Sequence, residues 1–279
     1  MIQDIEPYKF NNQYTPQAPK EDSFVLMYEN RQVWVKEEEG NIDFPTFKDL
    51  EKQEEGIRER GVYLFSIDDK KFFMVRDLDT TKFEGMKYEP LNYLRTASPK
   101  YLAFAGATGH QLYTWYQSRR YCGRCGTPML HDGKERMMYC ESCGNREYPK
   151  ICPAVIVGII NGDKLLLSKY VGREYKRYAL IAGFTEIGET MEETVRREVM
   201  EEVGLKVKNI RFYKSQPWAF TDTILMGFYC DLDGEEGITL DRQELALAEW
   251  VFREDIPDEG ENISLTKEMM MNFKNGGHC

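Results

Sequence analysis

The stretch Gly183–Leu205, which reads GFTEIGETMEETVRREVMEEVGL, decides the fold of this chain because it holds a complete helix with both of its ends. Thr190, followed three residues later by Glu193, predicts the start of that helix through a reciprocal cap of free backbone amides. Four apolar residues then recur every four positions and predict a face that packs on a core. They are Met191, Val195, Val199 and Val203. Gly204 follows, where the helix is expected to end.

The same predicted helix gathers carboxylates beside its apolar face. Glu198 and Glu202 lie four residues apart and share one side of the helix, and Glu201 lies three residues after Glu198. Like charges at this spacing repel one another and destabilise a helix, which suggests that a cation binds between them. Clusters of carboxylate oxygens suit Mg²⁺ or Mn²⁺. For these three residues alone, a solvated acidic helix face is the alternative interpretation.

The complete stretch resembles the signature of the Nudix hydrolases at every fixed position. The matching residues are Gly183, Glu189, Arg197, Glu198, Val199, Glu201, Glu202, Gly204 and Leu205. The resemblance implies an α/β (α+β) chain whose Nudix part is an α/β/α sandwich with a mixed sheet. In that family the signature forms a loop, a helix and a second loop. The family hydrolyses a nucleoside diphosphate that is linked to another moiety.

The Nudix resemblance also implies roles for individual residues. Arg197 is expected to pair with Glu189 and so to fix the helix against its loop. The catalytic set is expected to comprise these two residues together with the three glutamates of the helix. The expected ligands of Mg²⁺ or Mn²⁺ are the backbone carbonyl of Ala182 and the carboxylates of Glu198, Glu201, Glu202 and Glu244.

Four of the seven cysteines form two Cys-x-x-Cys pairs. They are Cys122, Cys125, Cys140 and Cys143. Four thiolates suit tetrahedral zinc; a redox site is the alternative, although a redox pair occurs singly and in a different context. Because protein would fill all four positions, the predicted Zn²⁺ is structural. Three of these cysteines are followed by glycines that are expected to adopt a positive φ, namely Gly123, Gly126 and Gly144.

A second motif, SQPWAFTDT at residues 215–223, follows the Nudix stretch. It predicts a loop that places Trp218 and Phe220 near the site, and the alternative is that both aromatic side chains belong to the core. The motif resembles that of the NADH pyrophosphatase branch of the Nudix family. It departs from the pattern of that branch at Ala219, Thr221 and Thr223. The loss of two prolines is expected to loosen the loop.

The resemblance to this branch covers the order of domains as well as the motif. It implies a homodimer whose sites are shared between subunits, with Phe184 and Tyr148 stacking on the nicotinamide. The residues expected to contact substrate are Glu135, Tyr148, Phe184, Gln216, Pro217, Trp218, Ala219, Phe220, Thr221, Asp222, Thr223 and Ser264.

Changes along the sequence predict an N-terminal α+β domain at 1–117, a zinc ribbon at 118–150 and a Nudix domain at 151–279. Asn161 and Gly162 predict a hairpin, because an Asn-Gly turn here separates two apolar runs. A second turn is expected at 68–70, between strands at 62–67 and 71–75. Further strands are expected at 23–28, 32–35, 223–230 and 247–252, and helices at 98–116 and 264–273. Two cysteines in apolar stretches, Cys152 and Cys230, are expected to be buried.

The composition is that of an ordinary globular protein, with 42% hydrophobic and 30% charged residues. The net charge of −10 is poorly suited to holding nucleic acid on a broad basic surface, although bound metal ions would let a site accept a small anion. No run of about 18 apolar residues predicts a membrane span, and the N-terminus lacks a secretory pattern. These features predict a cytoplasmic protein.

Together the motifs predict metal-dependent hydrolysis of the pyrophosphate of NADH or NAD to (reduced) nicotinamide mononucleotide and AMP. Removal of NAD caps from RNA 5′ ends is the same reaction on a larger substrate, and Arg119-Arg120-Tyr121 directly precedes the first cysteine of the predicted zinc site. Two alternatives stay open. The first is a Nudix hydrolase for ADP-ribose or a diadenosine compound, which the altered second motif favours. The second is a non-catalytic zinc-ribbon regulator that binds nucleotide or nucleic acid.

Overall fold

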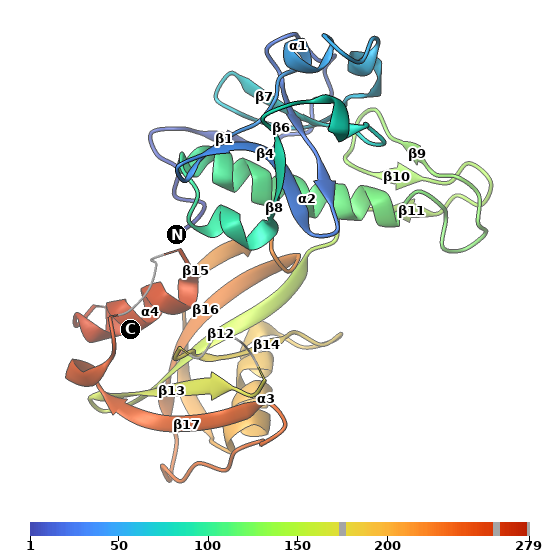
Figure 1. Ribbon diagram of the computed structural model, residues 1–279. Helices are drawn as coiled ribbons and strands as arrows, with labels where there is room; N and C mark the ends of the chain where they lie inside the picture. The colour runs from blue at the N-terminus through green and yellow to red at the C-terminus, as the bar shows by residue number, and fades with distance from the viewer. Residues whose placement is uncertain (173–176, 259–262, 278–279) are drawn as a thin grey trace. The chain divides into compact units, whose positions relative to one another are not determined.

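The computed structural model describes residues 1–172, 177–258 and 263–277 and divides into two compact units (Figure 1). The first unit comprises Met1, Ile151–Trp218 and Thr223–Cys279. The second unit comprises Ile2–Lys150 and Ala219–Asp222, so the zinc ribbon and the N-terminal region belong to one unit.

The first unit is built on one mixed sheet. Its strands are β12 (Cys152–Asn161), β13 (Lys164–Tyr170), β14 (Ile181–Phe184), β15 (Val207–Trp218), β16 (Thr223–Leu232) and β17 (Leu245–Phe252). They pair in the order β15-β16-β12-β13-β17, with β14 paired to β12 as well. Strands β12 and β16 run parallel, and the other pairs are antiparallel.

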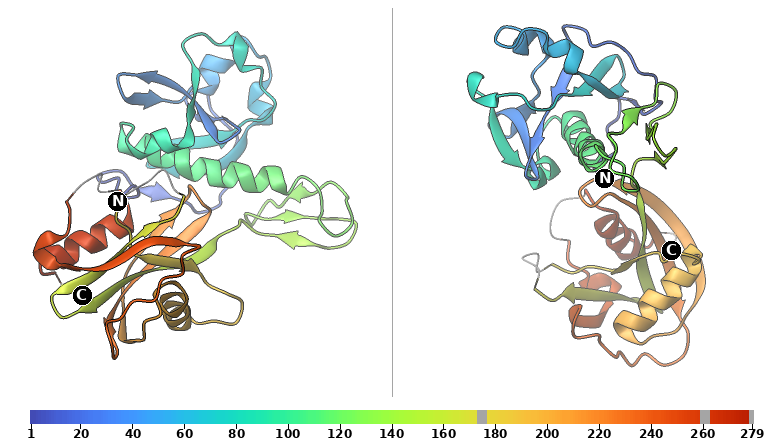
Figure 2. Two further views of the ribbon diagram at one scale, coloured as in Figure 1. Left: turned by 60° about the horizontal axis from the view of Figure 1, so that its bottom comes forward. Right: turned by 90° about the vertical axis from the view of Figure 1, so that its right-hand side faces the viewer.

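Two helices cover opposite faces of this sheet (Figure 2). Helix α3 (Met191–Val203) packs with Val155 and Val157 of β12, whereas α4 (Leu265–Lys274) packs with Ile156. Successive residues of a strand point to opposite faces, so one strand serves both cores. The arrangement confirms the expected α/β/α sandwich with a mixed sheet.

Helix α3 begins and ends where the sequence predicts. The hydroxyl of Thr190 accepts a hydrogen bond from the backbone amide of Glu193 at 3.2 Å, and the Glu193 carboxylate accepts one from the Thr190 amide at 2.8 Å. Gly204 ends the helix with a φ of +69°. The side chains of the predicted apolar face that are fully buried are Val195, Val199 and Val203.

The strands of the first unit test the predicted hairpin, the predicted loop of the second motif and the predicted burial of two cysteines. The Asn161–Gly162 hairpin is present, with Asn161 opposite Lys164 across β12 and β13. The second motif is not a loop throughout, because 215–218 belong to strand β15 and pair with β16. Cys230 is fully buried, whereas Cys152 is partly exposed at the start of β12, and its predicted burial is wrong.

The second unit has an α+β architecture, as expected. One sheet contains β1 (Phe10–Asn11), β6 (Val62–Ile67), β7 (Lys70–Met74) and β2 (Phe24–Leu26), and another contains β3 (Tyr28–Glu29), β4 (Gln32–Glu38), β5 (Asn41–Asp43) and β8 (Lys87–Pro90). Strands β6 and β7 form the predicted hairpin, and helix α2 (Lys100–Ser118) corresponds to the helix predicted at 98–116.

Short elements complete the two units. The ribbon strands are β9 (Leu130–His131), β10 (Met138–Tyr139) and β11 (Arg146–Glu147), which form a small antiparallel sheet. The remaining turns of helix are α1 (Phe47–Leu50), η1 (Ile57–Arg60), η2 (Thr80–Lys82), η3 (Leu91–Arg95) and η4 (Arg253–Asp255). Among the residues that the structure describes, no helix is both long and apolar enough to cross a membrane.

Gly204→Ala is expected to lower the free energy of unfolding more than Gly162→Ala does. Both glycines have a positive φ, at +69° and +59°. That conformation costs an L-residue about 1–2 kcal/mol. Only at Gly204 does an added Cβ also meet a neighbour, 2.9 Å from the Cβ of Thr239, whereas nothing lies within 4 Å at Gly162. Urea denaturation of both variants measures the difference, and equal losses would contradict a cost from the Thr239 contact.

Candidate functional site

A bidentate ion pair joins helix α3 to the loop before it. Arg197 Nε lies 2.5 Å from Glu189 Oε1, and Arg197 Nη2 lies 2.9 Å from Glu189 Oε2. The Glu189 carboxylate also accepts a hydrogen bond from the backbone amide of Glu186 at 3.0 Å. The bonds from Arg197 are the largest cause of the lowered pKa of Glu189, which is about 2. This carboxylate is therefore ionised at neutral pH and holds the loop in one conformation.

The same guanidinium extends from the loop to the acidic residues of the helix. Arg197 Nη2 donates to the carbonyl oxygen of Phe184 at 2.8 Å, at the end of strand β14. Arg197 Nη1 donates to Glu198 Oε1 at 2.7 Å and to Glu201 Oε2 at 3.0 Å. One side chain thus contacts the strand, the loop and two of the predicted metal ligands.

Gly183 makes room for the carboxylate of Glu198. A Cβ atom on Gly183 would lie 1.9 Å from Glu198 Cδ and 2.1 Å from both of its carboxylate oxygens. Real Cβ atoms do not make contacts this short. The backbone of β14 can therefore lie this close to the carboxylate only because residue 183 has no side chain. The first glycine of the signature therefore has a steric role at the site.

Two of the other predicted metal ligands, Glu201 and Glu244, lie close enough to Glu198 for their charges to act on it. Desolvation is the largest cause of its raised pKa, and the negative charges of Glu201 and Glu244 raise it further. Glu202 is buried, with 2% of its surface exposed, whereas Glu201 and Glu244 are exposed. Like charges held near one another raise a carboxyl pKa, and a bound cation relieves that repulsion.

These residues fit a divalent cation by their chemistry, since hard cations such as Mg²⁺ and Mn²⁺ prefer oxygen ligands. Ala182 lies in β14 opposite Ile156, next to the glycine that receives Glu198. The carboxylate oxygens themselves are not gathered into one tight group. In the described parts of the chain, only the four ribbon cysteines bring three or more potential metal-ligating side chains within 4.8 Å of one another.

Thr194 is a site residue that the sequence analysis missed. Its hydroxyl donates to Glu189 Oε2 at 3.0 Å and contacts the carbonyl oxygen of Thr190 at 3.1 Å, and its side chain is fully buried. It lies beside Val195 on the covered side of α3. The available signal for this role was a polar residue directly before Val195, beside the predicted apolar face.

Two of the predicted substrate contacts are bonded to each other in the second unit. The Tyr148 hydroxyl donates to Glu135 Oε2 at 2.8 Å, and this bond is the largest cause of the raised pKa of Tyr148. Tyr148 is 53% exposed, so its side chain is accessible to solvent. Phe184, in the first unit, is 55% exposed at the end of β14.

Gln216 has a structural partner that the sequence did not predict. Its side chain is fully buried, its Nε2 donates to the carbonyl oxygen of Ile263 at 2.9 Å, and its Oε1 accepts from the amide of Leu265 at 2.7 Å. These bonds bracket Ser264, whose own hydroxyl accepts from the Lys267 amide at 3.3 Å and caps α4. The Gln216 side chain therefore braces the start of α4.

The remainder of the second motif has mixed environments. Ala219 and Phe220 are buried in the second unit, so the alternative interpretation that Phe220 belongs to the core is the one that the structure supports. Trp218 is only partly buried. Asp222 forms an ion pair with Lys150 at 3.7 Å. The other residues of the motif divide by exposure: Pro217 and Thr221 are exposed, and Thr223 is buried. Their predicted contacts with substrate stay predictions.

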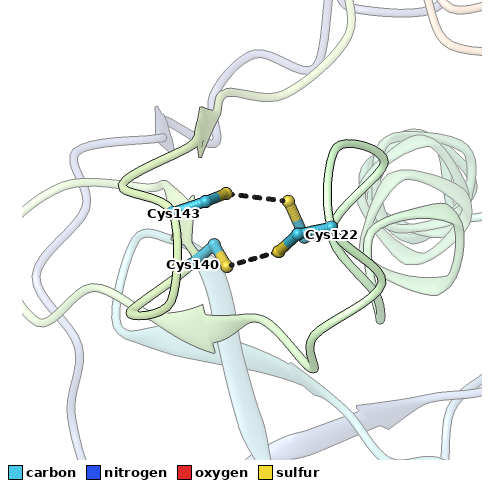
Figure 3. Close-up of side chains that lie close together, drawn as sticks. Cys122, Cys140 and Cys143 are labelled. Atoms are coloured by element: carbon cyan, nitrogen blue, oxygen red, sulfur yellow. Dashed lines mark hydrogen bonds between the residues drawn. The ribbon is translucent and has the colours of Figure 1, made fainter.

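The four cysteines of the ribbon converge from its two turns (Figure 3). The sulfur atoms of Cys122 and Cys143 lie 3.6 Å apart, and those of Cys125 and Cys140 lie 3.5 Å apart. Tetrahedral zinc with Zn–S bonds of about 2.3 Å requires sulfur atoms about 3.8 Å apart. The spacing fits a structural zinc ion and leaves no ligand position for substrate.

Both turns of the ribbon have the same backbone geometry. The amide of Gly126 donates to the carbonyl of Cys122, and the amide of Gly144 donates to the carbonyl of Cys140, each at 2.9 Å. These glycines have φ values of +77° and +72°, as expected. Gly123 does not adopt a positive φ, and that expectation is wrong.

The family models match the two regions whose geometry is described above. The NUDIX domain model matches residues 150–272, and the model of the NADH pyrophosphatase zinc ribbon domain matches residues 117–148. Residues 150–272 form a NUDIX domain. The Nudix signature thus lies in its own domain, directly after the zinc ribbon of the NADH pyrophosphatase type.

Curated relatives extend the similarity across the ribbon and the Nudix domain. The chain is 42% identical over 161 residues to a protein of Photorhabdus laumondii named NAD-capped RNA hydrolase NudC, covering 58% of this chain and 62% of that protein. It is 43% identical over 149 residues to a protein of the same name from Salmonella paratyphi C, covering 53% of this chain and 58% of that one. The chain therefore matches only about three fifths of the length of these relatives.

A solved NUDIX hydrolase from Nitrosomonas europaea matches 57% of this chain and 94% of its own chain, with a TM-score of 0.46 and 21% identity.

Cys125→Ser is expected to lose most of the bound zinc, because a hydroxyl is a poor substitute for a thiolate ligand. Metal analysis of the purified protein measures this, and the unfolding temperature should fall with it. Cys152→Ser is the control, since Cys152 lies in β12 outside the cluster. Full zinc content in Cys125→Ser would contradict the assignment.

Gly183→Ala is expected to weaken Mn²⁺ binding by at least about tenfold, a usual loss when the support of a metal ligand is disturbed. The added Cβ would occupy the place of the Glu198 carboxylate. Calorimetric titration with Mn²⁺ tests this. The matched control is Gly237→Ala, where nothing lies within 4 Å of the added Cβ. Similar affinities in both variants would mean that Glu198 does not hold metal in this position.

Proposed function

We propose that this protein hydrolyses the pyrophosphate of NADH or NAD, with divalent metal, to give (reduced) nicotinamide mononucleotide and AMP. The observation that carries the proposal is the environment of the Glu198 carboxylate. It lies against Gly183 and accepts a hydrogen bond from Arg197, and the negative charges of Glu201 and Glu244 raise its pKa. The zinc ribbon of the NADH pyrophosphatase type supports the choice of substrate.

The residues that would hold Mg²⁺ or Mn²⁺ are Glu198, Glu201, Glu202 and Glu244, with the carbonyl of Ala182. Such ions, when bound, polarise the phosphoryl oxygens and neutralise their charge. Glu201 and Glu244 are exposed, and either carboxylate could accept the proton of the attacking water.

The surrounding residues position this acidic group. Arg197 and Glu189 fix the helix against the loop through two parallel hydrogen bonds, and Thr194 completes the carboxylate's partners. A bidentate pair has a fixed geometry, so α3 presents its glutamates in a set orientation. A fixed orientation of these glutamates matters because a displacement of a catalytic group by about 1 Å is enough to slow a reaction severely.

The proposal extends to substrate binding and assembly. Tyr148 and Phe184 are exposed aromatic residues suited to stacking on the nicotinamide ring, and Glu135 holds the Tyr148 hydroxyl. We infer a cytoplasmic homodimer with a structural zinc ion in each chain, as the family resemblance implies. NAD-capped RNA is included as a substrate because the relatives with 42–43% identity carry that name.

A second candidate substrate class is favoured by one observation. Ala219 and Thr221 stand where the NADH pyrophosphatase motif has prolines, and this difference could admit ADP-ribose or a diadenosine compound instead. The chemistry and the metal site would be the same.

The deciding experiment is product analysis with NADH, NAD, ADP-ribose, diadenosine tetraphosphate and a 5′-NAD-capped RNA, with Mg²⁺ or Mn²⁺. We expect metal-dependent release of AMP and reduced nicotinamide mononucleotide, with NADH cleaved fastest. Glu202→Gln is expected to abolish turnover, with zinc content unchanged, because a neutral amide binds a divalent cation far more weakly than a carboxylate does. Glu192→Gln is the matched control, an exposed glutamate on the same helix.

The panel separates the candidates. Rapid cleavage of ADP-ribose or of the diadenosine compound, without cleavage of NADH, would keep the chemistry and discard the substrate. No cleavage of any member would overturn the proposal. Normal rates in Glu202→Gln would show that the metal ligands are assigned wrongly.

A further inference from the structure

The end of strand β14 presents its residues alternately to the two faces of the mixed sheet. Gly183 faces helix α3, because the Glu198 carboxylate occupies the place where a Cβ on Gly183 would lie. Ala182 packs with the buried cluster under helix α4, on the opposite face. Side chains alternate along a strand, so Phe184 points to the same face as Ala182. The Glu198 carboxylate and the Phe184 ring therefore lie on opposite faces of the sheet.

The pairing of the strands continues from Phe184 across the sheet in one row. Phe184 lies opposite Ala154 of β12, and Ala154 is in register with Leu225 of β16. Leu225 in turn lies opposite Gln216 of β15. Residues paired in this way point to the same face, and Leu225 packs with the same cluster as Ala182 does. Neighbouring strands are about 4.8 Å apart, so three spacings place Gln216 about 14 Å from Phe184. The residues of this cross-strand row are Phe184, Ala154, Leu225 and Gln216.

The cross-strand row is accessible at one end and covered at the other. Phe184 is 55% exposed and Leu225 is partly exposed, whereas Ala154 is small and buried. Gln216, at the far end, is fully buried, and the main chain at the start of α4 is bonded to its amide. An aromatic ring that stacks on Phe184 would lie on this face, with Ala154 next to it and the start of α4 across the row.

Two hydrogen bonds from Gln216 hold the start of α4 at its end of the row. The Gln216 Nε2 donates to the carbonyl oxygen of Ile263, and its Oε1 accepts from the amide of Leu265. The first amides of a helix have no partner within the helix, so the second bond supplies one for Leu265. The position of the backbone on either side of Ser264 therefore depends on the Gln216 side chain.

The later turns of α4 are anchored to strand β16 by different contacts. Gly227 lets the helix approach closely, since a Cβ there would lie 2.7 Å from Met269 Sδ. The Tyr229 hydroxyl donates to the carbonyl oxygen of Met269 at 2.6 Å and accepts from Asn272 Nδ2 at 3.2 Å. Loss of the Gln216 bonds is therefore expected to shift the start of the helix while its later turns stay in place.

We propose that the substrate passes around the end of β14, with its pyrophosphate at the carboxylates of α3 and its nicotinamide ring on the opposite face against Phe184. Gln216 is a positioning residue for this ring, because it fixes the backbone on either side of Ser264 across the row. The identity of the substrate rests on the proposed function. Gln216 and Leu225 thus act on ring binding and not on the metal ligands.

Gln216→Met tests the positioning role, because methionine has a similar length and makes neither hydrogen bond. Calorimetry is expected to show about tenfold weaker binding of nicotinamide mononucleotide, since two backbone groups at the start of α4 lose their partner. The KM for NADH should rise by a similar factor with little change in kcat, and the affinity for Mn²⁺ should not change. Asn272→Leu is the matched control, because it removes a hydrogen bond near the other end of α4. It should lower the unfolding temperature without weakening the binding of nicotinamide mononucleotide.

A second pair of variants tests which face of the sheet binds the ring. Leu225→Trp would place a large side chain in the cross-strand row and is expected to weaken the binding of nicotinamide mononucleotide at least about tenfold. Ile224→Trp is its control, because Ile224 is the preceding residue of β16, is also partly exposed and points to the other face. It should leave that affinity unchanged.

The binding measurements decide on the proposal without turnover. An unchanged affinity for nicotinamide mononucleotide in Gln216→Met or Leu225→Trp would overturn it, as would an equal loss in their controls or an equal loss of Mn²⁺ affinity. Weaker binding of AMP in place of nicotinamide mononucleotide would overturn the orientation of the substrate. If the unmodified protein cleaves no dinucleotide but the variants show the expected losses, the proposed function fails and the ring site stands. If the unmodified protein does not bind nicotinamide mononucleotide, the ring site is overturned.

Discussion

The guanidinium of Arg197 is the centre on which the candidate site depends. It holds both oxygens of Glu189, the carbonyl of Phe184 and one oxygen each of Glu198 and Glu201. Charge-assisted bonds of this kind are shorter and more directional than neutral ones. A loop, a strand end and a helix are therefore fixed relative to one another by a single side chain, and in that arrangement Gly183 leaves room for the Glu198 carboxylate.

The second motif shows how packing redistributes roles within a run of residues. Strand pairing with β16 places Gln216 inward, between its exposed neighbours Ser215 and Pro217. A buried amide must be hydrogen-bonded, and the main chain at the start of α4 supplies both partners. Gln216 was predicted to contact substrate because of its position in the motif. Its side chain instead connects strand β15 to the start of helix α4, and its two hydrogen bonds fix the backbone on either side of Ser264.

The zinc ribbon and the Nudix helix use negative groups in two different ways. Four cysteine sulfur atoms lie within 4.8 Å of one another, so protein would fill the entire coordination shell of a bound zinc ion. The predicted ligands among the carboxylates of α3 do not converge in this way, and Glu201 stays exposed to solvent. A closed set of soft ligands stabilises a small fold, whereas an open set of hard ligands leaves room for the oxygens of a substrate.

The sequence alone determined the features that short-range spacing controls: the limits of α3, the hairpin at Asn161, the four cysteines, and the Glu189–Arg197 pair through the family signature. Tertiary structure decided what depends on residues far apart in the chain. Strand β15 extends to Trp218 because β16 pairs with it, Gln216 is buried because α4 covers it, and Cys152 is partly exposed despite its apolar sequence. Local patterns report backbone preference and periodicity, but burial depends on which distant segment supplies the other surface.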